Sequence, residues 1–323
     1  MSVAVEDRVD ATLTLERAEW ADANGYEAIS IAEISSWEAF AMLGAIAMRT
    51  RHAALGTGMV SLYSRSIPIF AEALATLDDL APGRVFLGLS TGARVWRGWH
   101  GTKGLYETPE AALRQYILGI RRLLQGGGDS EKVWVDSSDF WVLNLPNLPK
   151  TIPIYAGTLG EKALAVTREV ADGWYPPCMP VDTVVRLAHE HLGDDWLRGG
   201  DGKPTIVYVI AAASEDRAEA RAAARECVVR YTYFVKAIAD RMKEDDEELV
   251  NAMLRKWQLG DTDEAVEMLP DAMLDRYSVS GTPAECRAAL DRFFDAGVAR
   301  VVVGPPPTAS PKLIDSTIRA LAP

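Results

Sequence analysis

The sequence is poor in cysteine and histidine. Its three cysteines, Cys178, Cys227 and Cys286, lie far apart and form no Cys-x-x-Cys pair, so neither a disulfide framework nor a zinc site is expected. Two of the four histidines, His189 and His191, are two positions apart, which directs them to different faces of a helix. We therefore predict no metal site. The low and odd number of cysteines favours a reducing cytoplasm.

Clustered positive charge and long apolar segments are also lacking. The 323-residue chain has 46 acidic and 34 basic side chains, a net charge of −12. Binding to nucleic-acid phosphates needs clustered Lys and Arg, so we expect no nucleic-acid partner. No apolar segment reaches the about 20 residues that a membrane-spanning helix needs, and the first residues meet charge too early for a signal peptide. These absences predict a cytoplasmic protein. They leave a small-molecule partner open, because local backbone N–H groups can hold a small anion.

What the sequence does contain is a regular alternation of short apolar segments and amphipathic ones. It predicts about eight strands, each followed by a helix, and one long helix over 216–242. The expected strands cover residues 2–5, 28–32, 53–60, 84–89, 152–156, 173–175, 206–212 and 300–303. A doubly wound dinucleotide fold has a glycine motif after its first strand, where this chain has Glu6-Asp7-Arg8. We therefore predict a single (β/α)₈ TIM barrel over residues 1–323, with an acidic helical insertion around 243–275.

In such a barrel the functional residues follow the carboxyl ends of the strands. Those positions hold few nucleophile–base pairs and many small residues that offer backbone N–H groups. Residues 157–160 (Gly-Thr-Leu-Gly) lead directly into a predicted helix, whose N-terminus favours a phosphate. An ordinary strand–helix turn explains the same residues equally well.

Two further motifs leave alternatives open. Residues 88–92 (Gly-Leu-Ser-Thr-Gly) match the Gly-x-Ser-x-Gly elbow of α/β-hydrolases, but loop-like residues follow where the elbow needs a helix. His100 lies in a stretch rich in tryptophan and glycine at the predicted active face. It serves either as an acid or ligand contact or as a packing residue of that loop.

Taken together, several stretches resemble the bacterial luciferase-like superfamily of flavin and deazaflavin oxidoreductases. The resemblance rests on the order and spacing of residues 23–33, 50–58, 65–78, 81–92, 98–101, 153–157, 171–174 and 281–303. Within the superfamily the chain is most similar to the branch that uses coenzyme F420, which includes methylenetetrahydromethanopterin reductase. The stretch 98–101, followed by a proline-started helix at Pro109, suggests that branch.

The resemblance implies a (β/α)₈ barrel that forms a homodimer through the helices expected at 37–49 and 68–80. It also implies a bulge with a non-prolyl cis peptide bond, Gly58–Met59, at the end of the third strand. The residues expected to contact the cofactor are Gly58, Met59, Ser90, Thr91, Gly92, Gly157, Thr158, Leu159 and Gly160.

The resemblance further suggests which residues act on the substrate. Glu33 is the first candidate general acid and Glu6 the second, although each could equally be an ion-paired residue at the rim. His100 is a third candidate. Trp37, Trp99 and Arg97 are expected in the substrate pocket. Relatives often carry histidine at position 34 and glutamate at position 93, where this chain has Ile34 and Ala93. The sequence therefore predicts an F420-dependent oxidoreductase that transfers a hydride, with an FMN-dependent monooxygenase and a non-catalytic ligand-binding barrel as alternatives.

Overall fold

The computed structural model describes residues 1–5, 10–33, 36–92, 108–126, 143, 145, 147–149, 151–199 and 203–323. Its strands are β1 (Ser2–Ala4), β2 (Ala28–Ile31), β3 (Ala54–Thr57), β4 (Val60–Ser61), β5 (Val85–Ser90), β6 (Ile154–Gly157), β7 (Gly173–Trp174), β8 (Ile206–Ala213), β9 (Ser278–Gly281) and β10 (Arg300–Gly304). All pair in parallel, in the order β7-β6-β5-β3-β2-β1-β10-β8-β9, with β4 on β5.

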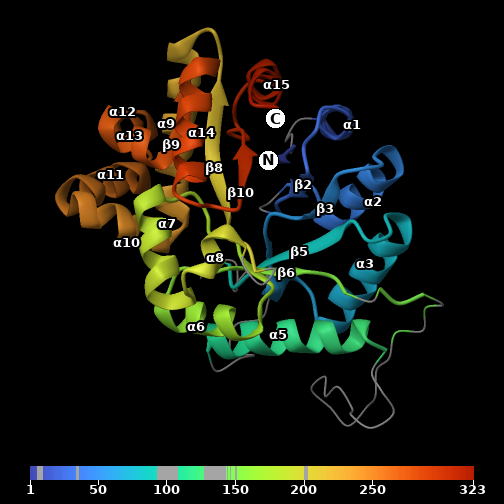
Figure 1. The fold of residues 1–323 in the computed structure, drawn as a ribbon. Helices are drawn as coiled ribbons and strands as arrows, with labels where there is room; N and C mark the ends of the chain where they lie inside the picture. Colours follow the sequence, from blue (N-terminus) through green and yellow to red (C-terminus); the bar gives the residue numbers. More distant parts are fainter. Residues whose placement is uncertain are drawn as a thin grey trace.

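The sheet curls until its β7 end reaches β8. Trp174 of β7 bridges Thr205, directly before β8, and its backbone N–H donates to the Pro204 carbonyl at 3.0 Å. The chain thereby forms a barrel with helices around the outside (Figure 1). The barrel predicted from the alternating pattern is confirmed.

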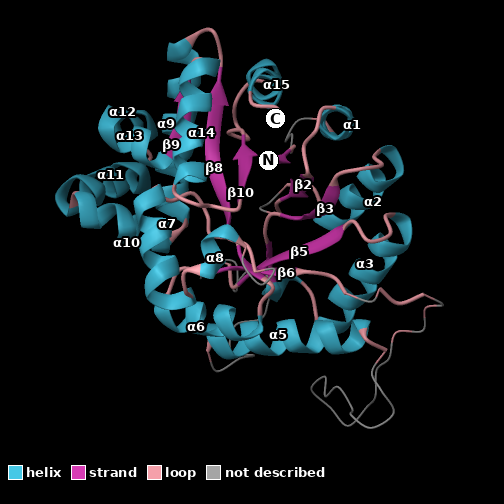
Figure 2. Cartoon of the chain, viewed as in Figure 1, coloured by secondary structure: helices cyan, strands magenta, loops and turns pink. Residues whose placement is uncertain are grey.

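The helices follow the predicted pattern with local differences (Figure 2). They are α1 (Ala11–Ala23), α2 (Ala39–Arg49), α3 (Ile67–Leu80), α5 (Pro109–Leu124), α6 (Glu161–Val170), α7 (Val181–Leu187), α8 (Asp195–Arg198), α9 (Arg217–Phe234), α10 (Lys236–Asp245), α11 (Glu247–Leu259), α12 (Thr262–Glu267), α13 (Asp271–Tyr277), α14 (Pro283–Asp295) and α15 (Pro311–Ala320). None of the described helices is both long and apolar enough to cross a membrane.

Two predictions about elements were wrong. A single helix was expected over 216–242, but it breaks at Val235 into α9 and α10, because the backbone leaves helical geometry there with φ −112° and ψ 88°. Strand β9 was not expected at all, since Ser278–Gly281 is short and carries one valine. The segment 243–275 contains the end of α10, then α11, α12 and most of α13.

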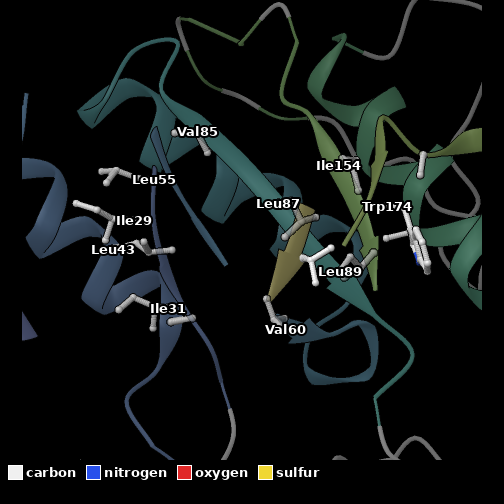
Figure 3. Close-up of a cluster of buried hydrophobic side chains, with 14 of the residues drawn as sticks. Ile29, Ile31, Leu43, Leu55, Val60, Val85, Leu87, Leu89, Ile154 and Trp174 are labelled. Atoms are coloured by element: carbon white, nitrogen blue, oxygen red, sulfur yellow. The ribbon is translucent and has the colours of Figure 1, made fainter. Parts of the chain in front are cut away.

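The strands are covered on both faces, which explains their near-continuous apolar character. Ile29, Ile31, Leu87, Leu89 and Ile154 belong to the core between the strands and the helices (Figure 3). Alternate residues of the same strands face the barrel interior, where a smaller cluster includes Ala28, Phe86 and Tyr155. Side chains therefore fill the barrel, and a ligand can enter only at an end of the strands.

Candidate active site

A bulge interrupts the third barrel strand at the carboxyl end of the sheet. Gly56 pairs with Phe86 and Val60 pairs with Leu89. The segment from Gly56 to Val60 therefore has one residue more than the segment of β5 that it faces. The Gly58–Met59 peptide bond within this bulge is cis, which confirms the predicted feature. The bulge is held to β2, because the Gly58 N–H donates to the Ile31 carbonyl at 2.9 Å and the Glu33 N–H donates to the Met59 carbonyl at 3.1 Å.

Met59 lies where two glycines of the neighbouring strands leave room. A Cβ atom on Gly88 would lie 2.9 Å from the Met59 sulfur, and one on Gly157 would lie 2.6 Å from its methyl carbon. Gly88 must lack a side chain in any case, because a Cβ atom there would also lie 2.1 Å from the Thr57 carbonyl oxygen. A Cβ atom on Gly157 would displace the methyl end of the flexible Met59 side chain. The glycines in β5 and β6 therefore leave the space that Met59 occupies.

The turn between β6 and α6 is fixed from behind. The Thr158 and Thr167 hydroxyl groups are hydrogen-bonded at 2.8 Å, and the buried Trp174 indole N–H donates to the Thr158 carbonyl at 2.8 Å. Gly160 is the N-cap of α6 and supplies no side-chain cap, and a Cβ atom there would meet no atom within 4 Å. The first turn of α6 thus offers backbone N–H groups to an anion.

A cavity of about 1010 Å³ opens at this end of the barrel. The nine residues expected to contact a cofactor all line it: Gly58, Met59, Ser90, Thr91, Gly92, Gly157, Thr158, Leu159 and Gly160. Its volume lies at the upper end of the roughly 300–1,000 Å³ that is usual for small-molecule sites. The structure thus brings together residues that are about 100 positions apart in the chain.

Glu33 is held by an ion pair with Arg65 and is not among the described residues that line the cavity. The Arg65 guanidinium contacts both Glu33 oxygens, at 3.0 and 2.6 Å, and also contacts Glu38. The Ala39 N–H at the start of α2 donates to Glu33 at 3.0 Å. Burial alone would lower the pKa of Arg65, but Glu33 and Glu38 raise it. An arginine partner favours the charged carboxylate, which suits a positioning role better than a proton donor.

The other predicted side chains are placed differently. Trp37 is half-buried against the main core and does not appear among the described cavity residues. Glu6, Arg97, Trp99 and His100 lie outside the residues that the structure describes. Their roles stay predictions.

Five aromatic residues of the cavity were not anticipated: Tyr175, Tyr208, Tyr231, Tyr233 and Phe234. Tyr175 directly follows β7, and a Cβ atom on Gly58 would lie 2.9 Å from its hydroxyl oxygen. Its place at a strand end could have singled it out. The last three lie at the end of α9, and no sequence signal marked them because one continuous helix was expected there.

Comparisons with known proteins identify similar chains. The family model described as luciferase-like monooxygenase matches residues 4–300. A 5,10-methylenetetrahydromethanopterin reductase from Methanolobus tindarius is 28% identical over 301 residues, which cover 90% of this chain and 89% of the relative. An F420-dependent glucose-6-phosphate dehydrogenase from Nakamurella multipartita is 25% identical over 276 residues, 82% of this chain and 75% of the relative.

The fold has a solved counterpart. The structure of the coenzyme F420-dependent tetrahydromethanopterin reductase from Methanopyrus kandleri superposes with a TM-score of 0.83 at 20% identity. The match covers 100% of this chain and 97% of that structure. At this identity the likeness concerns the fold.

Proposed function

The chain belongs to the luciferase-like monooxygenase family, and from this premise we propose that it is a coenzyme F420-dependent oxidoreductase acting on a small organic substrate. The observation that carries the proposal is that the nine residues which the resemblance implied as cofactor contacts all line one cavity at the carboxyl end of the barrel. Two of the relatives described above are named as F420-dependent enzymes.

The residues present fit such a cofactor. F420 combines a flat ring system with an anionic tail. The ring would lie against the Gly58–Met59 bulge, whose shape Gly88 and Gly157 secure. The tail would meet the uncapped first turn of α6 at Gly160, which has open space before it. When bound, a deazaflavin supplies or accepts a hydride at a carbon atom of its ring.

The chain's own residues position the reactants and supply the proton. Thr57 holds the bulge in register, since its hydroxyl donates to the Gly88 carbonyl at 2.7 Å and accepts from the Gly88 N–H at 3.0 Å. Tyr175, 2% exposed, carries a hydroxyl proton beside Gly58 on the cavity lining. Tyr175 is thus a second candidate proton donor beside Glu33, which is paired with Arg65.

Fluorescence titration of the purified chain with F420 and, separately, with FMN tests the proposal. We expect saturable F420 binding and no comparable FMN binding. Tight FMN binding without F420 binding would favour the monooxygenase alternative, which the description of the family supports. If neither cofactor binds, the non-catalytic ligand-binding barrel is the better explanation.

We also propose that the chain is a homodimer. Helices α2 and α3 expose Met48 (61%), Ile69 (47%) and Leu80 (42%), and an open groove of about 290 Å³ lies between these helices. Exposed apolar surface of this kind favours association. Light scattering should give twice the chain mass for the wild type and the single mass for Ile69→Glu combined with Leu80→Glu. Equal masses for the wild type and the double variant would contradict the interface.

We further propose a cytoplasmic location, which the three buried free thiols fit.

A further inference from the structure

A second set of residues lining the cavity has large aromatic side chains, in contrast to the small residues at the strand ends. Tyr208 of β8 and Tyr231, Tyr233 and Phe234 of α9 supply aromatic rings to it, and we call these four residues the aromatic wall. The residues expected to contact the cofactor, by contrast, come from β3 to α6. The cavity is thus built from two different kinds of surface.

The rings of the aromatic wall are arranged by contacts among themselves. Tyr208 and Tyr231 are nearly parallel, with an interplanar angle of 14° and centroids 6.3 Å apart. Tyr233 packs edge-on against Phe234 at 5.1 Å and lies 6.0 Å from Trp257 of α11. The break at Val235 ends α9 directly after these rings, so they stand at a helix terminus beside the cavity. Contacts with other rings of the protein therefore fix the rings of the aromatic wall in place.

The wall also leaves aromatic surface uncovered. Tyr233 is 37% and Phe234 43% exposed, although both are large apolar rings beside a cavity. The Lys236 ammonium beside these rings is already paired with both Asp240 oxygens, at 2.7 and 2.5 Å. A charged ligand would have to compete with that ion pair, whereas a neutral ring would only cover apolar surface.

We propose that the aromatic wall is the substrate subsite and that it selects a neutral molecule with a planar conjugated ring. This inference rests on the proposed function, in which the strand-end side of the same cavity holds the cofactor. It names the substrate class of that site. The ring would stack on the faces and edges that the four aromatic residues present.

Isothermal titration calorimetry on the F420-loaded chain tests this with three probes of similar size. They are 2-acetylnaphthalene, its saturated analogue 2-acetyldecalin, and the anion 2-naphthoate. We expect the naphthyl ketone to bind roughly fivefold or more tighter than either of the others, since aromatic pairs add specifically to burial. Equal binding of the decalin ketone would overturn the planar requirement, and equal binding of naphthoate would overturn the neutral one.

Variants locate the probe. Tyr231→Leu and Phe234→Leu should each weaken binding of the naphthyl ketone roughly three- to tenfold and leave F420 binding unchanged. Leu259→Ala is the matched control, because Leu259 lies on α11 with 76% exposure and does not line the described cavity. Unchanged binding in both leucine variants, or displacement of F420 by the ketone, would overturn the subsite. If F420 itself does not bind, the proposed function fails, while titration of the ketone into the F420-free chain still decides the role of the wall.

Discussion

The two sides of the cavity are built by different means. On the strand-end side, from β2 to α6, the lining consists mainly of small residues and backbone groups fixed by hydrogen bonds behind them. On the other side, β8 and α9 contribute the aromatic wall, whose rings contact one another and Trp257 of α11. A surface made of backbone groups tolerates few substitutions, because a larger side chain at its small residues would change its shape. A surface made of side chains can be altered by single substitutions, which suits adaptation to different substrates.

Each side also has a largely buried arginine that joins two segments of the chain. Arg65, 12% exposed, binds Glu33 and Glu38 at the start of α2, and its guanidinium lies 5.0 Å from the Phe40 ring. Arg221, 9% exposed, joins α9 to Asp271 and Asp275 of α13. The two arginines differ in what depends on them. Through Glu33, Arg65 supports the bulge, whereas Arg221 supports the helices behind the aromatic wall.

The largest expected effect is that of Arg65→Met. Removing one partner of a buried ion pair costs roughly 3–5 kcal/mol, and we expect about 3 kcal/mol because both partners are partly exposed. Glu33 would lose its ion pair with Arg65, which would loosen its backbone contact to Met59 and with it the bulge, so F420 binding should weaken at least tenfold. Urea unfolding and F420 titration measure the two effects.

Arg221→Met is the matched variant on the other side. Its carboxylate partners are 67% and 54% exposed and can be rehydrated, so the loss of stability should be smaller. Binding of 2-acetylnaphthalene should weaken and F420 binding should not. If both variants weakened binding of both ligands alike, the division of the cavity into two sides would be wrong.

Glu33→Gln adds a check on mechanism: an unchanged pH profile of turnover identifies Glu33 as a positioning residue.

The next largest expected effect is a loss in free energy of unfolding when the contact between Gly157 and Met59 is altered. Gly157→Ala places a Cβ atom where the Met59 methyl lies, and overpacking of this kind costs roughly 1–3 kcal/mol. Met59→Ala removes the methyl and leaves a cavity instead. The double variant should therefore lose clearly less free energy of unfolding than the two single losses together. Strictly additive losses would show that Met59 does not occupy the space above Gly157.

The difference between the two sides also explains how far the sequence could be interpreted. The alternation of apolar and amphipathic segments was enough for the barrel, because parallel strands covered on both faces have a distinctive pattern. Gly58, Ser90 and Gly157 could be placed at the cavity because strand ends converge in a barrel. Topology placed them at the same end of the barrel, and the resemblance suggested that they contact a cofactor.

The aromatic wall could not be predicted in this way. Tyr233 and Phe234 reach the cavity only because the helix breaks at Val235, and neither proline nor glycine marks that break in the sequence. The partner of Glu33 was equally hidden. Arg65 is 32 positions away, and only the folded bulge brings the two together. Long-range side-chain contacts of this kind depend on tertiary structure, which local patterns do not encode.

The smallest expected effect tests where the anionic part of the cofactor binds. Gly160→Asp and Gly160→Asn place side chains of the same shape into open space at the N-cap of α6, where both residues are favourable. Their stabilities should agree closely, so a difference in binding reports charge alone. The aspartate should weaken F420 binding roughly two- to fivefold relative to asparagine at low salt, because a negative charge at a helix N-terminus competes with an anionic ligand for the same N–H groups. The difference should shrink as salt is raised. Equal affinities at low salt would place the anion away from α6, and the strand-end side would then hold the ring without the tail.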